Sequence, residues 1–245
     1  MSLPDRTVEV AVRGRGRPLI VLEAGCTCDF SAWAPVFADL AQRSETFAYS
    51  RPGYGRSTLV ATPRDVTTEA RELRQLLRAI GRGPPYLLVG HSLGGLIVQA
   101  FAAAHPEEVA GLVLVDPTPL DLIERMHRDL PEALDAFYDA WAVAVGVARL
   151  EFEHLRPPGG GRFSGEPYGG PVIVLGAWML EDLGFKSVRR YHRLHRIPRT
   201  VARYAKAELR KVACGHYIQC QRPLAVIDAV DEVLARARTP LFDEE

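Results

Sequence analysis

The segment 90–94 (GHSLG) contains the residues of this sequence whose types and spacing point most directly to chemistry. It lies between a continuously apolar run at 86–89 and an almost wholly apolar stretch at 96–105, which predict a buried strand and a buried helix. Glycine at positions 90 and 94 lets neighbouring backbone pass close to a tight turn, so the hydroxyl of Ser92 is expected to project from the sheet. The start of the following helix would supply N–H groups where an oxyanion forms. This pattern is typical of a serine nucleophile.

A serine nucleophile needs a base, and the sequence has seven histidines. His91 lies inside the turn, where we expect it to point away from Ser92, and His105 ends the apolar helix. Four others lie in polar or arginine-rich segments: His127, His154, His192 and His195. Only His216 lies in a loop that directly follows an expected strand and precedes a terminal helix, and a glycine comes immediately before it. From this loop its imidazole could take the serine proton. We therefore expect His216 to be the base.

The elements that position these residues alternate between short β-rich runs and helical runs, which predicts a parallel sheet covered on both faces. The expected strands cover residues 7–12, 18–23, 46–50, 86–89, 111–115, 172–176 and 209–213. Helices are expected around 33–42, 62–80, 96–105 and 225–236. The second of these is expected to have Pro63 at its first helical position and to bury a stripe at Leu73, Leu76, Leu77 and Ile80.

With this order of elements and the serine turn after its strand, the chain resembles the α/β-hydrolase fold family over nearly its whole length. The resemblance implies a mostly parallel eight-stranded sheet with helices on both faces, forming a single domain over residues 1–245. It also implies a small helical cap between the sixth and seventh strands, at about 120–170. The family's triad runs in the order nucleophile, acid, histidine, and Ser92 and His216 fit the first and third places. The oxyanion hole would use the backbone N–H groups of Cys26 and Leu93.

The acid is where the sequence departs from the family's common pattern. Most members carry an aspartate about three residues after the closing glycine of the seventh strand, where this chain has Met179. Glu181 and Asp182 follow shortly and would reach the histidine if the loop bulges. Some members, haloalkane dehalogenases among them, hold the acid at the end of the sixth strand, which here is Asp116. We favour Asp116, whose carboxylate could accept the second N–H of His216 and fix its tautomer.

Composition excludes several classes of function. The chain is 47% hydrophobic and 24% charged, and its 30 Lys and Arg equal its 30 Asp and Glu, so no overall field favours nucleic acid or an anionic membrane. No apolar run of signal-peptide or membrane-spanning length occurs, and we expect a cytoplasmic protein. Cys26 and Cys28, like Cys214 and Cys220, lack the spacing of a zinc site. We therefore expect neither a metal nor a cofactor.

The expected function is that of a serine hydrolase that cleaves a small to medium carboxylic ester or thioester through an acyl-enzyme on Ser92, with His216 as general base. The alternatives use the same triad for a lyase, C–C hydrolase or acyltransferase reaction, or make the chain a non-catalytic binding protein on this fold. Segment 183–211 carries ten Lys or Arg against one acid. It either pairs with the acidic segment 120–155 or attracts an anionic substrate.

Overall fold

The computed structural model describes residues 1–3, 6–60, 64–118, 166–178, 204 and 207–238. Nearly all of the cap expected at about 120–170 lies outside these residues, and so do Glu181 and Asp182. Most of the basic segment 183–211 lies outside them as well. Within the described part of the chain, no helix is both long and apolar enough to span a membrane.

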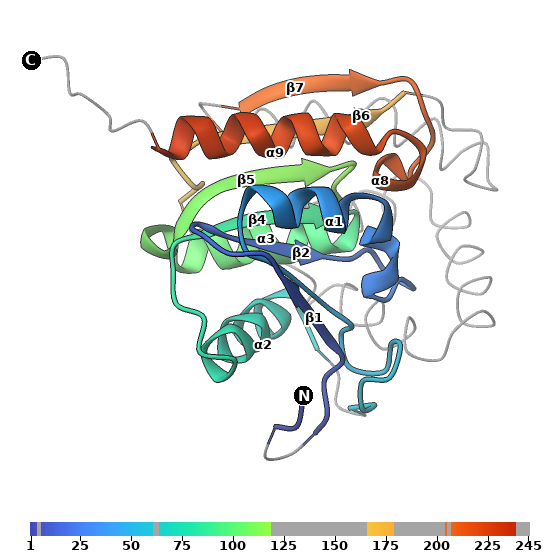
Figure 1. Ribbon diagram of the computed structural model, residues 1–245, viewed down its shortest axis with the longest axis vertical. Coiled ribbons are helices and arrows are strands. Elements are labelled where there is room, and N and C mark those ends of the chain that lie inside the picture. Colours follow the sequence, from blue (N-terminus) through green and yellow to red (C-terminus); the bar gives the residue numbers. More distant parts are fainter. Residues whose placement is uncertain (4–5, 61–63, 119–165, 179–203, 205–206, 239–245) are drawn as a thin grey trace, which may run out of the picture.

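A single mixed sheet forms the centre of the described structure (Figure 1). Its strands are β1 (Val10–Arg13), β2 (Leu19–Glu23), β3 (Thr46–Tyr49), β4 (Tyr86–His91), β5 (Val109–Val115), β6 (Val172–Ala177) and β7 (Ala207–Val212). They lie in the order β1-β3-β2-β4-β5-β6-β7. Only β1 is antiparallel to its neighbour, so β2 to β7 all present their carboxyl ends at one edge.

The sheet differs from the expectation of eight strands at its N-terminal side. Seven strands are formed among the described residues, and before β1 there is only an isolated antiparallel bridge between Ser2 and Thr7. A bridge of one residue pair is too short to build the hydrogen-bonded ladder of a strand. The expected strand at 7–12 correspondingly begins later, at Val10.

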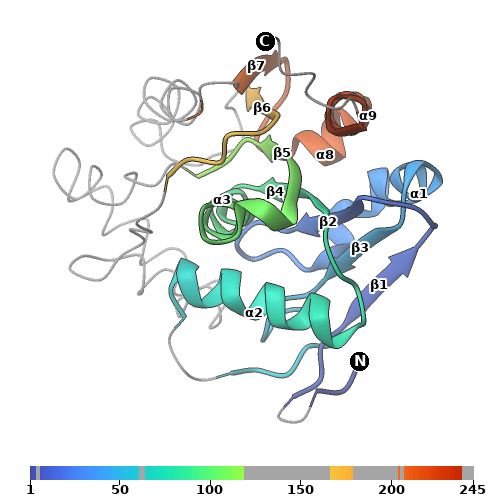
Figure 2. The same ribbon diagram turned by 90° about the vertical axis from the view of Figure 1, so that its left-hand side faces the viewer.

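Helices cover both faces of the sheet, as predicted (Figure 2). On one face lie α2 (Val66–Ala79) and α3 (Leu93–Ala104). On the other lie α1 (Ala34–Arg43), the short α8 (Ile218–Gln221) and α9 (Pro223–Arg238). Successive residues of a strand point to opposite faces of the sheet. Because helices cover both faces, all of these residues are buried in a central strand, and its sequence is continuously apolar. Leu88 packs with α2 and α3, whereas Leu87 and Val89 pack with α1 and α9.

Helix α2 begins three residues after the proline that was expected to open it. Its N-cap is Asp65, whose side chain accepts a hydrogen bond from the backbone N–H of Thr68 at 2.7 Å. Aspartate is a strong N-cap because its carboxylate satisfies an N–H that the first turn leaves without a partner. Of the predicted stripe, Leu73, Leu76 and Leu77 are buried, whereas Ile80 is the C-cap of α2 and is only partly buried against the same core.

Candidate active site

Ser92 occupies the turn between β4 and α3 in a backbone conformation that non-glycine residues rarely adopt. Its φ is 51° and its ψ is −117°, at the N-cap position of α3. The flanking glycines are required by close backbone contacts. A Cβ on Gly90 would lie 2.5 Å from the carbonyl oxygen of Gly94, and one on Gly94 would lie 2.3 Å from that of Glu23. The turn thus holds Ser92 at the carboxyl edge of the sheet, where its side chain stays partly accessible.

Backbone hydrogen bonds connect this turn to the end of the neighbouring strand β5. The N–H of Ser92 donates to the carbonyl of Val115 at 3.1 Å, and the N–H of Thr118 donates to the carbonyl of Ser92 at 2.8 Å. Asp116 lies between those two residues, so these bonds place it beside the turn that carries Ser92.

The side chains of Asp116 and His216 are in direct contact. Nδ1 of His216 lies 2.5 Å from Oδ2 of Asp116, although the two residues are 100 positions apart in the chain. Asp116 is 1% exposed, and its other oxygen accepts the N–H of Ala177 at 3.2 Å. An aspartate held in this way can keep the proton of the imidazole on Nδ1 and leave Nε2 available as a base.

His91 supports the loop that carries His216. It is 1% exposed, and its Nε2 lies 3.1 Å from the backbone carbonyl of His216. The two imidazole rings are 4.6 Å apart, and the ring of Tyr217 lies 5.3 Å from His91. The position of His91 inside the turn predicts no role for its side chain. The structure places its side chain under the histidine loop.

The turn after β2, which contains Gly25 and Cys26, lies directly against the serine turn. A Cβ on Gly25 would be 2.7 Å from Nδ1 of His91 and 3.3 Å from Cβ of Ser92, so only glycine fits. Leu93 is the first residue of α3. Its N–H therefore belongs to the four that a helix cannot bond internally. The two backbone groups expected to form an oxyanion hole thus come from segments that contact Ser92.

Sequence reasoning missed a buried charge network behind this turn. Arg51 and Glu23, both at most 1% exposed, form an ion pair at 2.8 Å, and Arg51 also donates to the carbonyls of Ala24 and Gly25. The hydroxyl of Tyr49 donates to the other oxygen of Glu23 at 2.6 Å, and burial raises the pKa of Tyr49 well above its usual value. The available signal was a glutamate ending the apolar run 19–23.

The four cysteines are all free thiols. Burial raises the pKa of Cys28, Cys214 and Cys220, so their thiolate forms are disfavoured at neutral pH. Burial also raises the pKa of Tyr217 to about 12, which keeps its hydroxyl neutral beside the histidine loop. Cys28, Cys214, Cys220 and Tyr217 therefore do not compete with Ser92 as anionic nucleophiles near neutrality.

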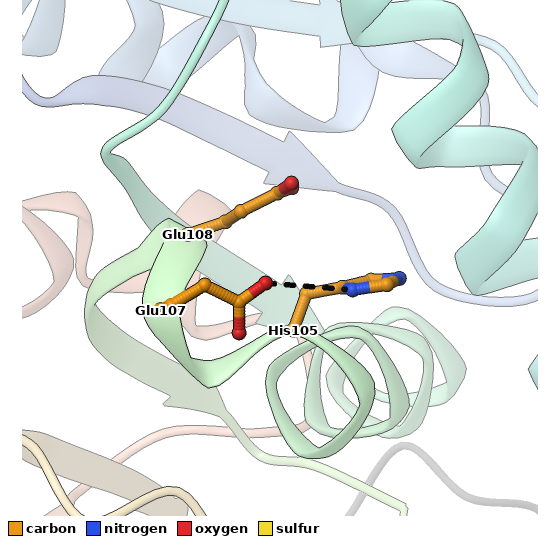
Figure 3. Close-up of side chains that lie close together, drawn as sticks. All are labelled: His105, Glu107 and Glu108. Atoms are coloured by element: carbon orange, nitrogen blue, oxygen red, sulfur yellow. Dashed lines mark ion pairs between the residues drawn. The ribbon is translucent and has the colours of Figure 1, made fainter.

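Among the described residues, one group of three side chains has the ligand types and spacing to hold a cation. Ligand atoms of His105, Glu107 and Glu108 lie within 4.8 Å of one another, at the end of α3 and in η2 (Pro106–Glu108) (Figure 3). Glu108, however, already accepts hydrogen bonds from Arg74, the shortest at 2.6 Å, and pairs with Arg78. The cluster also precedes β5, at the opposite end of that strand from Asp116. We assign no metal to it.

A family model described as the alpha/beta hydrolase fold matches residues 17–175, which is more than half of the chain. Among curated proteins, the uncharacterized protein YqjL of Bacillus subtilis is 34% identical over 122 residues, which cover 47% of this chain and 48% of that protein. The 2-(acetamidomethylene)succinate hydrolase of Mesorhizobium japonicum is 33% identical over 145 residues, which cover 58% of this chain and 51% of that protein. The matches thus span about half the length of these curated relatives.

Among solved structures, the enol-lactonase from Burkholderia xenovorans LB400 superposes with a TM-score of 0.67 at 18% identity, covering 95% of this chain and 98% of that one. At this identity the likeness concerns the fold alone. The family match agrees with the parallel sheet, its covering helices and the serine turn between β4 and α3. The chain belongs to the alpha/beta hydrolase fold family.

Proposed function

We propose that the protein is a serine hydrolase that cleaves a small to medium carboxylic ester or thioester through an acyl-enzyme on Ser92. The observation that carries this proposal is the 2.5 Å contact between Asp116 and His216 beside the strained serine turn. In this family such an arrangement corresponds to a nucleophile, an acid and a base in chain order. Asp116 is the proposed acid because the structure brings its carboxylate to Nδ1 of His216.

The proposed reaction begins with attack of the Ser92 hydroxyl on the substrate carbonyl, while Nε2 of His216 takes the hydroxyl proton. Asp116 stabilises the imidazolium that results. The tetrahedral oxyanion accepts hydrogen bonds from the N–H groups of Cys26 and Leu93. Collapse of this intermediate breaks the bond to the alcohol or thiol, which leaves with the proton from His216. Water then attacks the acyl-enzyme by the same steps and releases the acid.

The similar proteins widen the substrates worth testing. One relative is named a 2-(acetamidomethylene)succinate hydrolase, and one structural neighbour is an enol-lactonase. A lactone is a cyclic ester, so the same attack by Ser92 would open its ring. A substrate panel for this protein therefore includes lactones beside linear esters and thioesters.

The test is a panel of chromogenic esters of two to eight acyl carbons, matched thioesters and lactones, assayed with purified protein. We expect hydrolysis of short to medium acyl chains, with an initial burst that matches the enzyme concentration. A fluorophosphonate probe should label wild-type protein, and Ser92→Ala should abolish both labelling and turnover. Wild-type protein that resists the probe and turns over none of the panel would instead favour a binding protein on this fold.

A further inference from the structure

The turn after β2 is held at both of its ends by the loop that follows β3. We propose that Arg51 and Tyr54 of this loop, with Glu23, form a clamp that aims the N–H of Cys26 at the substrate oxyanion. The clamp residues are positioning residues, because they act through the backbone of the turn. This inference rests on the proposed serine hydrolase function and adds to it the residues that set the geometry of the oxyanion hole.

Arg51 holds the first half of the turn through two successive carbonyl groups. Its guanidinium donates to the carbonyl of Ala24 at 2.6 Å and to that of Gly25 at 2.9 Å. The planar fork of an arginine suits such a double contact, which a lysine cannot reproduce. Glu23 neutralises the guanidinium at 2.8 Å, so the buried charge is compensated.

The contact with Gly25 also determines where the N–H of Cys26 points. The carbonyl of Gly25 and the N–H of Cys26 belong to one peptide unit, which is planar and in the trans form directs these two groups oppositely. Since Arg51 holds the carbonyl on its own side, the N–H of Cys26 faces the other way. The Cβ position of Gly25 is 3.3 Å from Cβ of Ser92, so this peptide unit adjoins the proposed nucleophile.

Tyr54 holds the second half of the turn. Its hydroxyl accepts the N–H of Thr27 at 3.2 Å and lies 3.7 Å from Sγ of Cys26. Thr27 has a φ of 64°, a conformation that a β-branched residue adopts only when its surroundings impose it. Tyr54 is itself 5% exposed, and Arg51 lies 5.3 Å from the centre of its ring. Cys26 is therefore the residue between two restrained peptide units.

A misdirected N–H in the oxyanion hole affects the tetrahedral state more than the bound substrate. Removal of one oxyanion donor typically lowers kcat by about 10²–10³. Loosening the clamp leaves the donor present but less well aimed, so we expect kcat to fall about tenfold in Tyr54→Phe and about a hundredfold in Arg51→Gln. The KM should stay within about twofold of wild type, because ground-state binding is unaffected.

The amide of Cys26 can be observed directly, without reliance on turnover. Protein labelled with 15N-cysteine gives four backbone amide signals, since the chain has four cysteines, and the signal that Cys26→Ser removes belongs to Cys26. In Tyr54→Phe and Arg51→Gln we expect this signal to shift or broaden and its hydrogen exchange to accelerate. The signal of Cys214, which follows the edge strand β7, should not move.

Two further variants keep this test decisive. Tyr86→Phe deletes another buried hydroxyl, which donates to the carbonyl of Arg82 at 2.8 Å near the amino end of β4, and it should leave both the Cys26 signal and kcat unchanged. The double variant Glu23→Gln/Arg51→Gln removes the guanidinium without leaving a buried carboxylate uncompensated, should Arg51→Gln alone not fold.

The kinetic readout is kcat and KM on the best ester, with the affinity of a boronic acid that forms a tetrahedral adduct. We expect the loss in kcat and the loss in boronate affinity to be parallel. An unchanged Cys26 signal in folded Tyr54→Phe and in a folded Arg51 variant would overturn the clamp, and so would a shifted signal with unchanged kcat. If wild-type protein turns over no substrate, the proposed function fails, while the amide signals still decide whether the clamp holds Cys26.

Discussion

At the scale of single residues, Asp116 is the position where side-chain chemistry and backbone geometry meet. It has a φ of 40°, which aspartate tolerates better than most residues because of its short polar side chain. One carboxylate oxygen accepts the N–H of Ala177 and the other lies against His216. This residue therefore connects the ends of β5 and β6 with the histidine loop, and both a structural and a proposed catalytic role depend on it.

Replacement of Asp116 by asparagine keeps the size of the side chain but removes its charge. We expect Asp116→Asn to lower kcat by about 10³–10⁴, because an amide no longer holds the imidazole in the required tautomer. The measurement is steady-state turnover, with the far-UV circular dichroism spectrum as a check of folding. Asp182→Asn and Glu181→Gln serve as matched controls and should stay close to wild type. Near-full activity of Asp116→Asn, with a large loss in Asp182→Asn, would assign the acid to Asp182.

At the scale of elements, the serine turn depends on backbone segments that approach within van der Waals distance. Glu23 and Gly90 are paired across the parallel strands β2 and β4, so the end of β2 lies alongside β4. The start of α3 then passes over both strands, with Gly94 against the carbonyls of Glu23 and Ala24. The position of Ser92 is thus set by three elements together: β2, β4 and α3.

A methyl group at position 94 should separate these elements. In Gly94→Ala the added Cβ would lie 2.3 Å from the carbonyl oxygen of Glu23. This oxygen belongs to the backbone, and moving it costs more free energy than moving the end of a flexible side chain. We expect a loss of about 1–3 kcal/mol in the free energy of unfolding and at least a tenfold loss of kcat, measured by urea unfolding and ester turnover. Gly83→Ala is the matched control, because nothing lies within 4 Å of its added Cβ. An unaffected Gly94→Ala protein would contradict this account of the turn.

The contact of α2 with η2 makes a pH-dependent contribution to stability. The hydrogen bonds from Arg74 lower the pKa of Glu108 below its ordinary value of 4.5. A carboxyl group whose pKa is lower in the folded state stabilises the fold above its unfolded pKa, and this contribution disappears as the pH falls through the folded pKa. We therefore expect Arg74→Gln to be less stable than wild type at pH 7. The difference between their urea midpoints should shrink below about pH 4.5. A difference independent of pH between 3 and 7 would contradict this assignment.

At the scale of the whole molecule, one sheet serves two hydrophobic cores. Leu88 belongs to the core shared with α2 and α3, and its chain neighbour Leu87 belongs to the core shared with α1 and α9. Both side chains are 0% exposed. Because the same strand contributes to both cores, neither core can form without the sheet.

Truncation on either face should therefore weaken the same folding transition. We expect Leu87→Ala and Leu88→Ala each to cost about 2–5 kcal/mol. Far-UV circular dichroism and tryptophan fluorescence should report one coincident urea transition in wild type and in both variants. Separate transitions for the two variants would show that the cores unfold independently.

Elements that depend on interactions between residues close together in the sequence are the ones that the sequence predicts correctly. The strands at 86–89 and 172–176, the buried helix after Ser92 and the leucine stripe of α2 depend on neighbouring residues, and the structure confirms these elements with small shifts of their ends. The start of α2 was misplaced because a competing cap, Asp65, lay three residues beyond the expected one. The family pattern predicts eight strands, of which the described residues form seven, and before β1 they form only the Ser2–Thr7 bridge.

The sequence by itself determined the alternating architecture, the strained turn at Ser92 and the place of His216 after the last strand, because periodicity and glycine spacing act over a few residues. Only the tertiary structure shows that the carboxylate of Asp116 meets His216. Asp116 lies 100 residues away along the chain, and the sheet brings the two together at its carboxyl edge. The same holds for Arg51 and Glu23, because the place of Glu23 at the end of an apolar run predicts a buried carboxylate but not its partner. Their pairing arises because β3 and β2 are parallel neighbours whose ends coincide.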